Sequence, residues 1–196
     1  MRHEARKEQI VNATLDLVAE YGVEGATVSR IAGSVGVTVP TLYAHFADRK
    51  EILLATVDLV FERIQAIHQS STNPNALERL REIAQFHTRL VSSKSNGFVT
   101  ALFEFIAAPP SEGLREAVGA GHWAIVEDLA RMVRVGQEQG SIIQEADPEQ
   151  TAWLIVSRDW TEDVAQLIGT SDRWDEARSN QMLDLILDSI AAPAEA

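Results

Sequence analysis

Residues 27–46 read TVSRIAGSVGVTVPTLYAHF, and this stretch decides how the N-terminal part of the chain folds. Thr27 and Thr38 each stand where a short amphipathic helix begins, and a hydroxyl side chain suits that position. Gly36 lies between the two segments and can take the positive φ that a tight turn needs. Pro40 falls in the first turn of the second helix, where its missing N–H costs nothing. This spacing predicts a helix-turn-helix.

The second short helix has an apolar side and a polar side. Leu42 and Phe46 are four residues apart, so they share one face and anchor the helix to the helix that opens the chain. The residues left for the outer surface or its edges are Thr38, Val39, Thr41, Tyr43, Ala44 and His45.

Apolar residues recur at helical spacing along the whole chain, and no β-type alternation is sustained. We therefore predict an all-α fold of about nine helices. A first helix ends at Gly22, the two short helices follow, and Asp48 caps a long helix to about Gln69. The remaining helices are expected at about 75–92, 97–107, 113–138, 148–168 and 175–191.

Composition favours a soluble, cytoplasmic protein. The 196 residues are 45% apolar and include no cysteine, which excludes disulfides and thiolate metal sites. No apolar run reaches the roughly 18 residues that cross a bilayer, and the opening MRHEARKEQI lacks the apolar core of a signal peptide. Residues 1–50 carry as many basic as acidic side chains, so the net charge of −12 belongs to residues 51–196. The first 50 residues can therefore approach a polyanion that the acidic remainder would repel.

Residues 7–55 resemble the DNA-binding head of the TetR/AcrR family of transcriptional regulators. The glycine after the first helix, Thr27, and the pairs IA, GV, LY and HF occur in the family's order. The resemblance implies a helix-turn-helix domain over residues 1–50 and a ligand-binding and dimerisation domain over residues 51–196. It also implies a ligand-responsive repressor that binds a palindromic operator in double-stranded DNA as a homodimer.

The resemblance also assigns roles to individual positions. Positions that grip phosphates in the family correspond to Thr27, Tyr43, His45 and Arg49. Positions that face bases correspond to Ser29, Thr38, Val39, Pro40, Thr41 and Ala44. The family usually has Lys followed by Glu before the long helix, whereas this chain has Arg49 followed by Lys50, and Lys50 could add a second phosphate contact.

The base-facing positions lack arginine, glutamine and asparagine. Val39, Ala44 and the methyl group of Thr41 can give only apolar contacts, and their natural target in the major groove is the thymine methyl group. We therefore expect a half-site read through thymine methyls, DNA shape and hydroxyl contacts, with Ser29 as the most adaptable reader.

Two sets of residues in the acidic body are candidates for binding. Pockets are mostly apolar with a few placed polar groups, so an effector pocket is expected from Phe86, His87, Leu90, Phe103, Glu104, His122, Trp123 and Val126. Apolar stripes on the last two long helices suit a four-helix interface between two copies. These stripes are Trp153, Val156, Trp160, Val164 and Leu167, followed by Met182, Leu183, Ile186, Leu187 and Ile190.

Several alternatives remain open at this point. The chain could be an activator, a DNA binder without ligand, or a partner-binding module whose helix-turn-helix no longer binds DNA. An all-α enzyme would need a nucleophile–base pair or a metal, and the sequence has neither a G-x-S-x-G motif nor histidines four apart on a helix. No cofactor, metal site or membrane partner is expected, and the effector is unknown.

Overall fold

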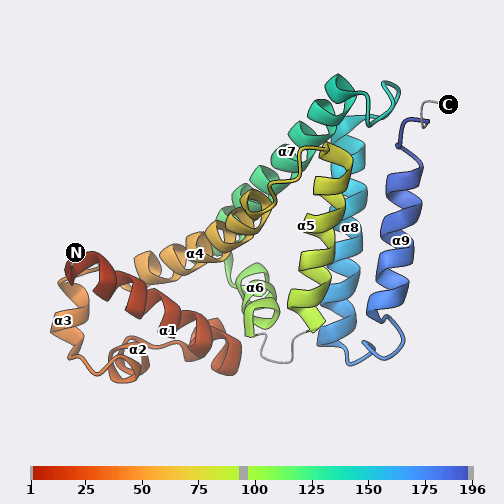
Figure 1. Cartoon of the computed structure of the whole chain (residues 1–196). Helices are drawn as coiled ribbons and strands as arrows, with labels where there is room; N and C mark the ends of the chain where they lie inside the picture. Colours follow the sequence, from red (N-terminus) through yellow and green to blue (C-terminus); the bar gives the residue numbers. More distant parts are fainter. Residues whose placement is uncertain (1, 93–96, 194–196) are drawn as a thin grey trace. The chain divides into compact units, whose positions relative to one another are not determined.

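The helices form close to where the sequence predicts them (Figure 1). The computed structural model describes residues 2–92 and 97–193, which hold nine α-helices, one 3-10 turn and a single β-bridge. The predicted all-α fold is therefore confirmed. No helix in these two ranges has both the length and the apolar character that a bilayer crossing requires. The bounds are α1 Arg2–Gly25, α2 Val28–Ser34, α3 Val39–Tyr43, α4 Arg49–Ser70, α5 Ala76–Ser92, α6 Gly97–Ala107, η1 Pro110–Glu112, α7 Leu114–Gln139, α8 Pro148–Leu167 and α9 Glu176–Asp188.

The chain divides into two compact units. The first unit comprises residues 1–63 with 95–122, and the second comprises residues 64–94 with 123–196. Helices α4 and α7 therefore contribute residues to both units. The predicted domains, residues 1–50 and 51–196, are each one continuous stretch of chain, whereas each of the two units combines two stretches. The predicted domain boundary stays a prediction.

Side-chain caps start both short helices of the first unit. The Thr27 hydroxyl accepts a hydrogen bond from the Arg30 N–H at 3.3 Å, and the Thr38 hydroxyl accepts one from the Thr41 N–H at 3.3 Å. Each cap satisfies an N–H group that has no partner inside its helix. The helices then close over one apolar core, whose buried members are Ile10, Val11, Ile31, Ala32, Val35, Leu42, Phe46 and Ile52.

A reciprocal cap starts the long helix α4. Asp48 accepts a hydrogen bond from the Glu51 N–H at 2.8 Å, while the Glu51 carboxylate accepts one from the Ala47 N–H. Two donors at the helix start are satisfied together by this arrangement. The predicted cap at Asp48 is therefore confirmed.

Glycine sets the backbone at two turns of the first unit. Gly36, with φ +68°, makes the turn between α2 and α3. Gly22 also has a left-handed φ of +72°, and it interrupts α1 rather than ending it, because helical backbone resumes and runs to Gly25. A Cβ at Gly22 would lie 2.8 Å from a carboxylate oxygen of Glu104 on α6.

In the second unit α5, α8 and α9 lie side by side (Figure 1). The core between these helices and α7 is aliphatic, and its fully buried members include Leu80, Ala84, Val126, Leu129, Val133, Ile155, Leu183 and Leu187.

The C-terminal helix ends earlier than expected. The predicted helix over 175–191 is wrong at its end, because α9 stops at Asp188. The residues that follow pair with the α7–α8 link instead: the Ile143 N–H donates to the Ile190 carbonyl at 2.9 Å, and the Ala192 N–H donates to the Ser141 carbonyl at 3.1 Å. These two bonds flank a bridge between Ile142 and Ala191 and offset the lost helical turn.

Gly36→Ala and Gly22→Ala test the two turns. No atom lies within 4 Å of a Cβ at Gly36, so only the left-handed backbone opposes alanine there, which costs about 1 kcal/mol. Gly22→Ala should cost more, because it also displaces Glu104. In a Glu104→Ala background we expect the excess to vanish, as measured by denaturant unfolding; an excess that persists would contradict this account of Gly22.

Candidate nucleic-acid interface and buried polar cluster

The outer side of α2 and α3 carries the residues predicted to contact DNA. Leu42 and Phe46 are buried, at 0% and 4% exposure, which confirms the predicted orientation of the second short helix. The predicted contact residues on the other side are exposed or half-buried. Thr27, Ser29, Thr38, Pro40, Thr41, Tyr43 and Ala44 are exposed, whereas Val39 and His45 are half-buried.

The capping hydroxyls on this surface keep a donor free. Thr27 and Thr38 use oxygen lone pairs to accept backbone N–H groups, so neither cap uses the hydroxyl hydrogen. The Thr38 and Thr41 hydroxyl oxygens lie 2.9 Å apart, so one donates to the other and the pair still offers one outward donor. A phosphate oxygen is a suitable acceptor for such donors.

His45 lies beside a group of basic residues from α1. Its ring lies 4.4 Å from the His3 ring, centroid to centroid. Burial lowers the pKa of His45, and the charges of His3, Arg6 and Lys7 lower it further. The sequence reading missed these three residues, although their spacing on one helix face beside the predicted motif was a usable signal. Arg6 and Lys7 thus place two positive charges beside His45, and Glu4 acts in the opposite direction.

Arg49 differs from its predicted role. Its Nε donates to the Ala26 carbonyl at 3.0 Å, its Nη2 donates to the Val23 carbonyl, and its Nη1 pairs with Glu112 at 3.2 Å. Two of the three nitrogens therefore bind the turn between α1 and α2 and the third pairs with Glu112, so a phosphate contact would require giving up one of these bonds. Lys50 is more exposed and donates to the Ser111 carbonyl at 3.3 Å.

Glu104 holds the same turn from the opposite direction. Its carboxylate accepts a hydrogen bond from the Val23 N–H at 3.3 Å. Arg49 of α4 and Glu104 of α6 thus both bind the backbone between Gly22 and Ala26, and Glu112 of the 3-10 turn pairs with Arg49. The turn that places α2 and α3 is consequently fixed by direct polar contacts from two other elements of its own unit.

The residues predicted to form one effector pocket fall in two different units. Phe103, Glu104 and His122 belong to the first unit, and Phe86, His87, Leu90, Trp123 and Val126 belong to the second. Burial lowers the pKa of His122.

The five predicted pocket residues of the second unit do not line one common pocket either. Trp123 and Val126 border a recess with Arg131 and Arg134. Phe86 is 39% exposed, and the Arg89 guanidinium lies 5.9 Å from the centre of its ring. Leu90 is half-buried, and His87 joins a separate polar cluster.

The second unit encloses this polar cluster around Arg158, whose side chain is fully buried. The guanidinium donates to the Glu162 carboxylate at 2.9 Å, to the Ala84 carbonyl at 3.2 Å and to the Ser179 carbonyl at 3.3 Å. The Thr88 hydroxyl accepts from Arg158 and lies 2.8 Å from Glu162. One buried cation therefore ties α5, α8 and α9 together.

His87 extends the cluster. Its Nε2 lies 3.3 Å from an Asp163 oxygen and 3.6 Å from a Glu162 oxygen. Burial by itself would lower the pKa of His87, but Asp159, Asp163 and Glu162 together raise it to about 9. Burial raises the pKa of Asp159 to about 6. Ligand atoms of His87, Asp159 and Glu162 lie within 4.8 Å of one another, so the set has a spacing that can also hold a cation.

The two apolar stripes predicted for a dimer interface behave differently. Leu183, Ile186 and Leu187 on α9 and Ile190 just beyond it are buried within the single chain, and Met182 is half-buried. Packing against α5 and α8 therefore already uses that stripe, which leaves little of it for a partner.

The α8 stripe remains largely open. Trp153, Val164 and Leu167 are 40%, 39% and 39% exposed, Trp160 is half-buried, and only Val156 is buried. This face of α8 is an apolar surface that the described residues leave exposed.

A helix-turn-helix head with an outward polar surface, joined to an all-α body, is the architecture of a one-component transcriptional regulator. The family model described as "Bacterial regulatory proteins, tetR family" matches residues 10–56. The A-factor receptor protein of Streptomyces griseus is 27% identical over 187 residues, which are 94% of this chain and 63% of the receptor. The transcriptional repressor KstR of Rhodococcus jostii is 32% identical over 43% of this chain and 40% of its own length. The chain therefore aligns with less than two thirds of the length of either relative.

Solved structures share the fold over nearly the whole chain. A TetR transcriptional regulator from Chloroflexus aurantiacus aligns with a TM-score of 0.80 and 16% identity, covering 98% of this chain and 100% of that one. The SmeT–triclosan complex aligns with a TM-score of 0.77 and 20% identity, covering 97% and 93%. The helix-turn-helix of this chain therefore matches the tetR family model, and its fold is shared by solved structures of TetR-family regulators.

His87 should make stability depend on pH in the alkaline range. Between pH 6.5 and about 9 the folded chain keeps a proton on His87 that the unfolded chain has lost, so the free energy of unfolding should fall as the pH rises, by up to about 3 kcal/mol. Asp159 and His68, with pKa values of about 6 and about 4, act only at lower pH. Urea unfolding from pH 6.5 to 9.5 measures the slope, and His87→Gln should flatten it. An equal slope in wild type and variant would contradict the assignment.

Proposed function

We propose that this chain is a transcriptional repressor that binds a palindromic operator as a homodimer and releases it when a small-molecule effector binds the helical body. The observation that carries the proposal is that the predicted contact residues of α2 and α3 lie exposed or half-buried, while Leu42 and Phe46 are buried in the core. Two similar proteins support the regulatory class: KstR is a transcriptional repressor, and SmeT is the repressor of a multidrug efflux pump that also forms a complex with triclosan.

Phosphate binding follows from the hydroxyls and cations at the edges of this surface. Thr27 and Thr38 stand at helix N-termini, where the amide dipoles favour an anion and the free hydroxyl hydrogen can donate to it. Tyr43 is 44% exposed, so its hydroxyl can reach the DNA backbone. Arg6 and Lys7 add positive charge beside His45. Arg49 acts instead as a positioning residue, because it fixes the turn that precedes α2.

Base recognition then depends on short side chains. Val39, Thr41 and Ala44 present methyl groups at the outer face or edge of α3 and at its end, and Ser29 presents a hydroxyl on α2. None of them can make the paired hydrogen bonds by which arginine reads guanine or asparagine reads adenine. We assign them to contacts with thymine methyl groups and to the shape of the groove.

Dimerisation is assigned to the open apolar stripe on α8. A stripe of this kind on one copy can pack against the same stripe on another, which gives two-fold symmetry. Two reading helices related by such an axis fit half-sites about 34–36 Å apart, and the operator is then palindromic.

Release requires that the effector change how the reading helices are held. The backbone between Gly22 and Ala26 is bound by Glu104 of α6 and by Arg49, which is itself paired with Glu112. A shift of α6 and its following turn would therefore move the start of α2. The effector's influence on DNA binding is limited to its difference in affinity for the two states.

Tyr43→Phe tests the phosphate contact, because it removes one hydroxyl and keeps the ring. We expect about a tenfold loss of operator affinity, the value of one charge-assisted hydrogen bond, and an equal loss on unrelated DNA. Tyr21→Phe is the matched control, because Tyr21 is similarly exposed at 47% but lies outside the contact set. Fluorescence anisotropy at fixed salt measures both.

The same variant also tests the sign of regulation. In a reporter driven by the operator, Tyr43→Phe should raise transcription. Unchanged affinity would contradict the phosphate role of Tyr43, and a fall in transcription would contradict repression.

Replacing thymine by deoxyuridine tests the reading surface, because it deletes only the methyl group. At operator positions beside Val39, Thr41 and Ala44 we expect each replacement to weaken binding several-fold, since a methyl contact is worth about 1 kcal/mol. Replacements outside the half-sites serve as controls. A selected operator with a guanine-rich core that tolerates deoxyuridine throughout would show that recognition runs through hydrogen bonds instead.

A further inference from the structure

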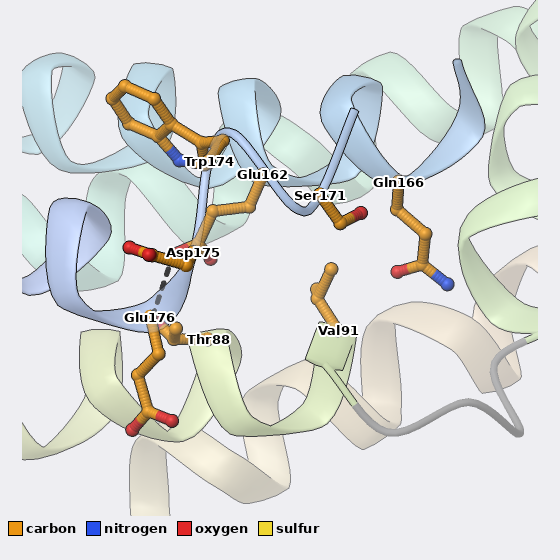
Figure 2. Close-up of a pocket in the computed structure, with 8 residues that line it drawn as sticks. All are labelled: Thr88, Val91, Glu162, Gln166, Ser171, Trp174, Asp175 and Glu176. Carbon is orange, nitrogen blue, oxygen red and sulfur yellow. Dashed lines mark hydrogen bonds between the residues drawn. The ribbon is translucent and has the colours of Figure 1, made fainter. Parts of the chain in front are cut away.

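A pocket in the second unit has none of the residues predicted to bind the effector among its lining residues. It is bounded by α5, by the C-terminal half of α8 and by the link from α8 into α9 (Figure 2). Its volume is about 350 Å³, which falls within the range of small-molecule sites and suits a ligand of about a dozen non-hydrogen atoms.

The pocket is acidic. Glu162, Asp175 and Glu176 line it, and no lysine, arginine or histidine is among its lining residues. The remaining wall includes the side chain of Val91 and the indole of Trp174. A concave site that is lined by negatively charged carboxylates attracts cations and raises their local concentration.

Three polar atoms at the pocket have no hydrogen-bond partner among the described residues. They are Oε2 of Glu162, Oε1 of Gln166 and Nε1 of Trp174. The Glu162 side chain is only 5% exposed, and buried polar atoms are nearly always paired. The pocket therefore offers two acceptors and one donor to a ligand, and Figure 2 shows Glu162, Gln166 and Trp174 bordering it from α8 and the link to α9.

The charges behind Glu162 leave room for one more cation. Its Oε1 already accepts from Arg158, Thr88 and Ser179, whereas Oε2 has only His87 at 3.6 Å. Arg158 and a protonated His87 supply two positive charges, against three carboxylates on α8 at positions 159, 162 and 163. A single positive charge in the pocket would balance this cluster.

The unpartnered atoms decide which cation fits. A quaternary ammonium has no N–H and cannot satisfy the Glu162 and Gln166 oxygens, whereas a primary ammonium has three N–H donors. A divalent metal would use the nearby set of His87, Asp159 and Glu162. It would have to displace the proton from His87, and it would leave the Trp174 N–H without an acceptor.

We propose that this pocket binds a small primary amine in its ammonium form, with Glu162 and Gln166 accepting its N–H groups and Trp174 donating to a hydroxyl or carbonyl oxygen of the same molecule. The site itself stands on the geometry of the second unit; its role as the effector site rests on the proposed function.

Isothermal titration calorimetry of the full chain with tyramine tests the site, because tyramine carries a primary ammonium and a phenolic oxygen. We expect saturable binding of one tyramine per chain. N-acetyltyramine, which has no charge, and N,N,N-trimethyltyramine, which has no ammonium N–H, should each bind at least tenfold more weakly. Equal binding of the three compounds would overturn the proposal, as would zinc chloride binding tightly while tyramine does not bind.

Two variants locate the binding. Gln166→Leu and Trp174→Phe each remove one hydrogen-bonding atom, and each should weaken tyramine binding about tenfold. Gln69→Leu is the matched control, because it makes the same change as Gln166→Leu at an exposed residue of α4 outside the pocket. Both pocket variants leave the bond between Arg158 and Glu162 intact, so they should fold as wild type does, which circular dichroism checks. Unchanged tyramine affinity in both folded variants would place the amine elsewhere and overturn the assignment.

Operator binding, measured in the same samples, separates this proposal from the proposed function. A chain that binds DNA but no tyramine overturns the amine site alone. A chain that binds tyramine at this pocket and no DNA supports the site and overturns the DNA-binding function. Weaker operator binding in saturating tyramine, absent in Gln166→Leu, would support the pocket as the effector site.

Discussion

The second unit depends on the need to pair one buried charge. Arg158 has no contact with solvent, so every N–H of its guanidinium must find an acceptor inside the protein. Those acceptors come from α5, α8 and α9, and they fix how the three helices meet. Glu162 is buried because it pairs with Arg158, and its second oxygen then borders the pocket. The same buried ion pair therefore holds the three helices together and supplies a carboxylate oxygen for a ligand.

The helix pattern could be predicted from sequence, but the faces of the helices could not all be predicted. Turn and cap residues such as Asp48 and Gly36 act locally, so the order of the helices follows from them. On α8 the assumption that apolar residues point inward fails: Trp153 and Val164 are exposed, while Arg158 and Glu162 are buried. Sequence reasoning assigns charges to the surface, and only the packed structure shows that these two charges neutralise each other.

In the helix-turn-helix, too, some features could be predicted from the sequence and others could not. The outward position of its polar residues follows from helical periodicity, because Leu42 and Phe46 define the inner face. The use of Arg49 does not follow, since its partners Val23 and Glu112 are distant in sequence and the choice between phosphate and backbone carbonyls is made by the fold. Contacts between residues that are close in sequence can be predicted from the sequence. Contacts between residues that are far apart along the chain become known only with the structure.

The short side chains of α3 have a consequence for the DNA that they read. In the major groove, 5-methylcytosine carries its methyl group at the same ring position as thymine. Under the proposed mode of DNA recognition, a surface made of Val39, Thr41 and Ala44 responds to that methyl group rather than to the hydrogen-bonding edge of the base. A DNA methyltransferase acting on cytosines within the operator would then alter recognition without changing the sequence.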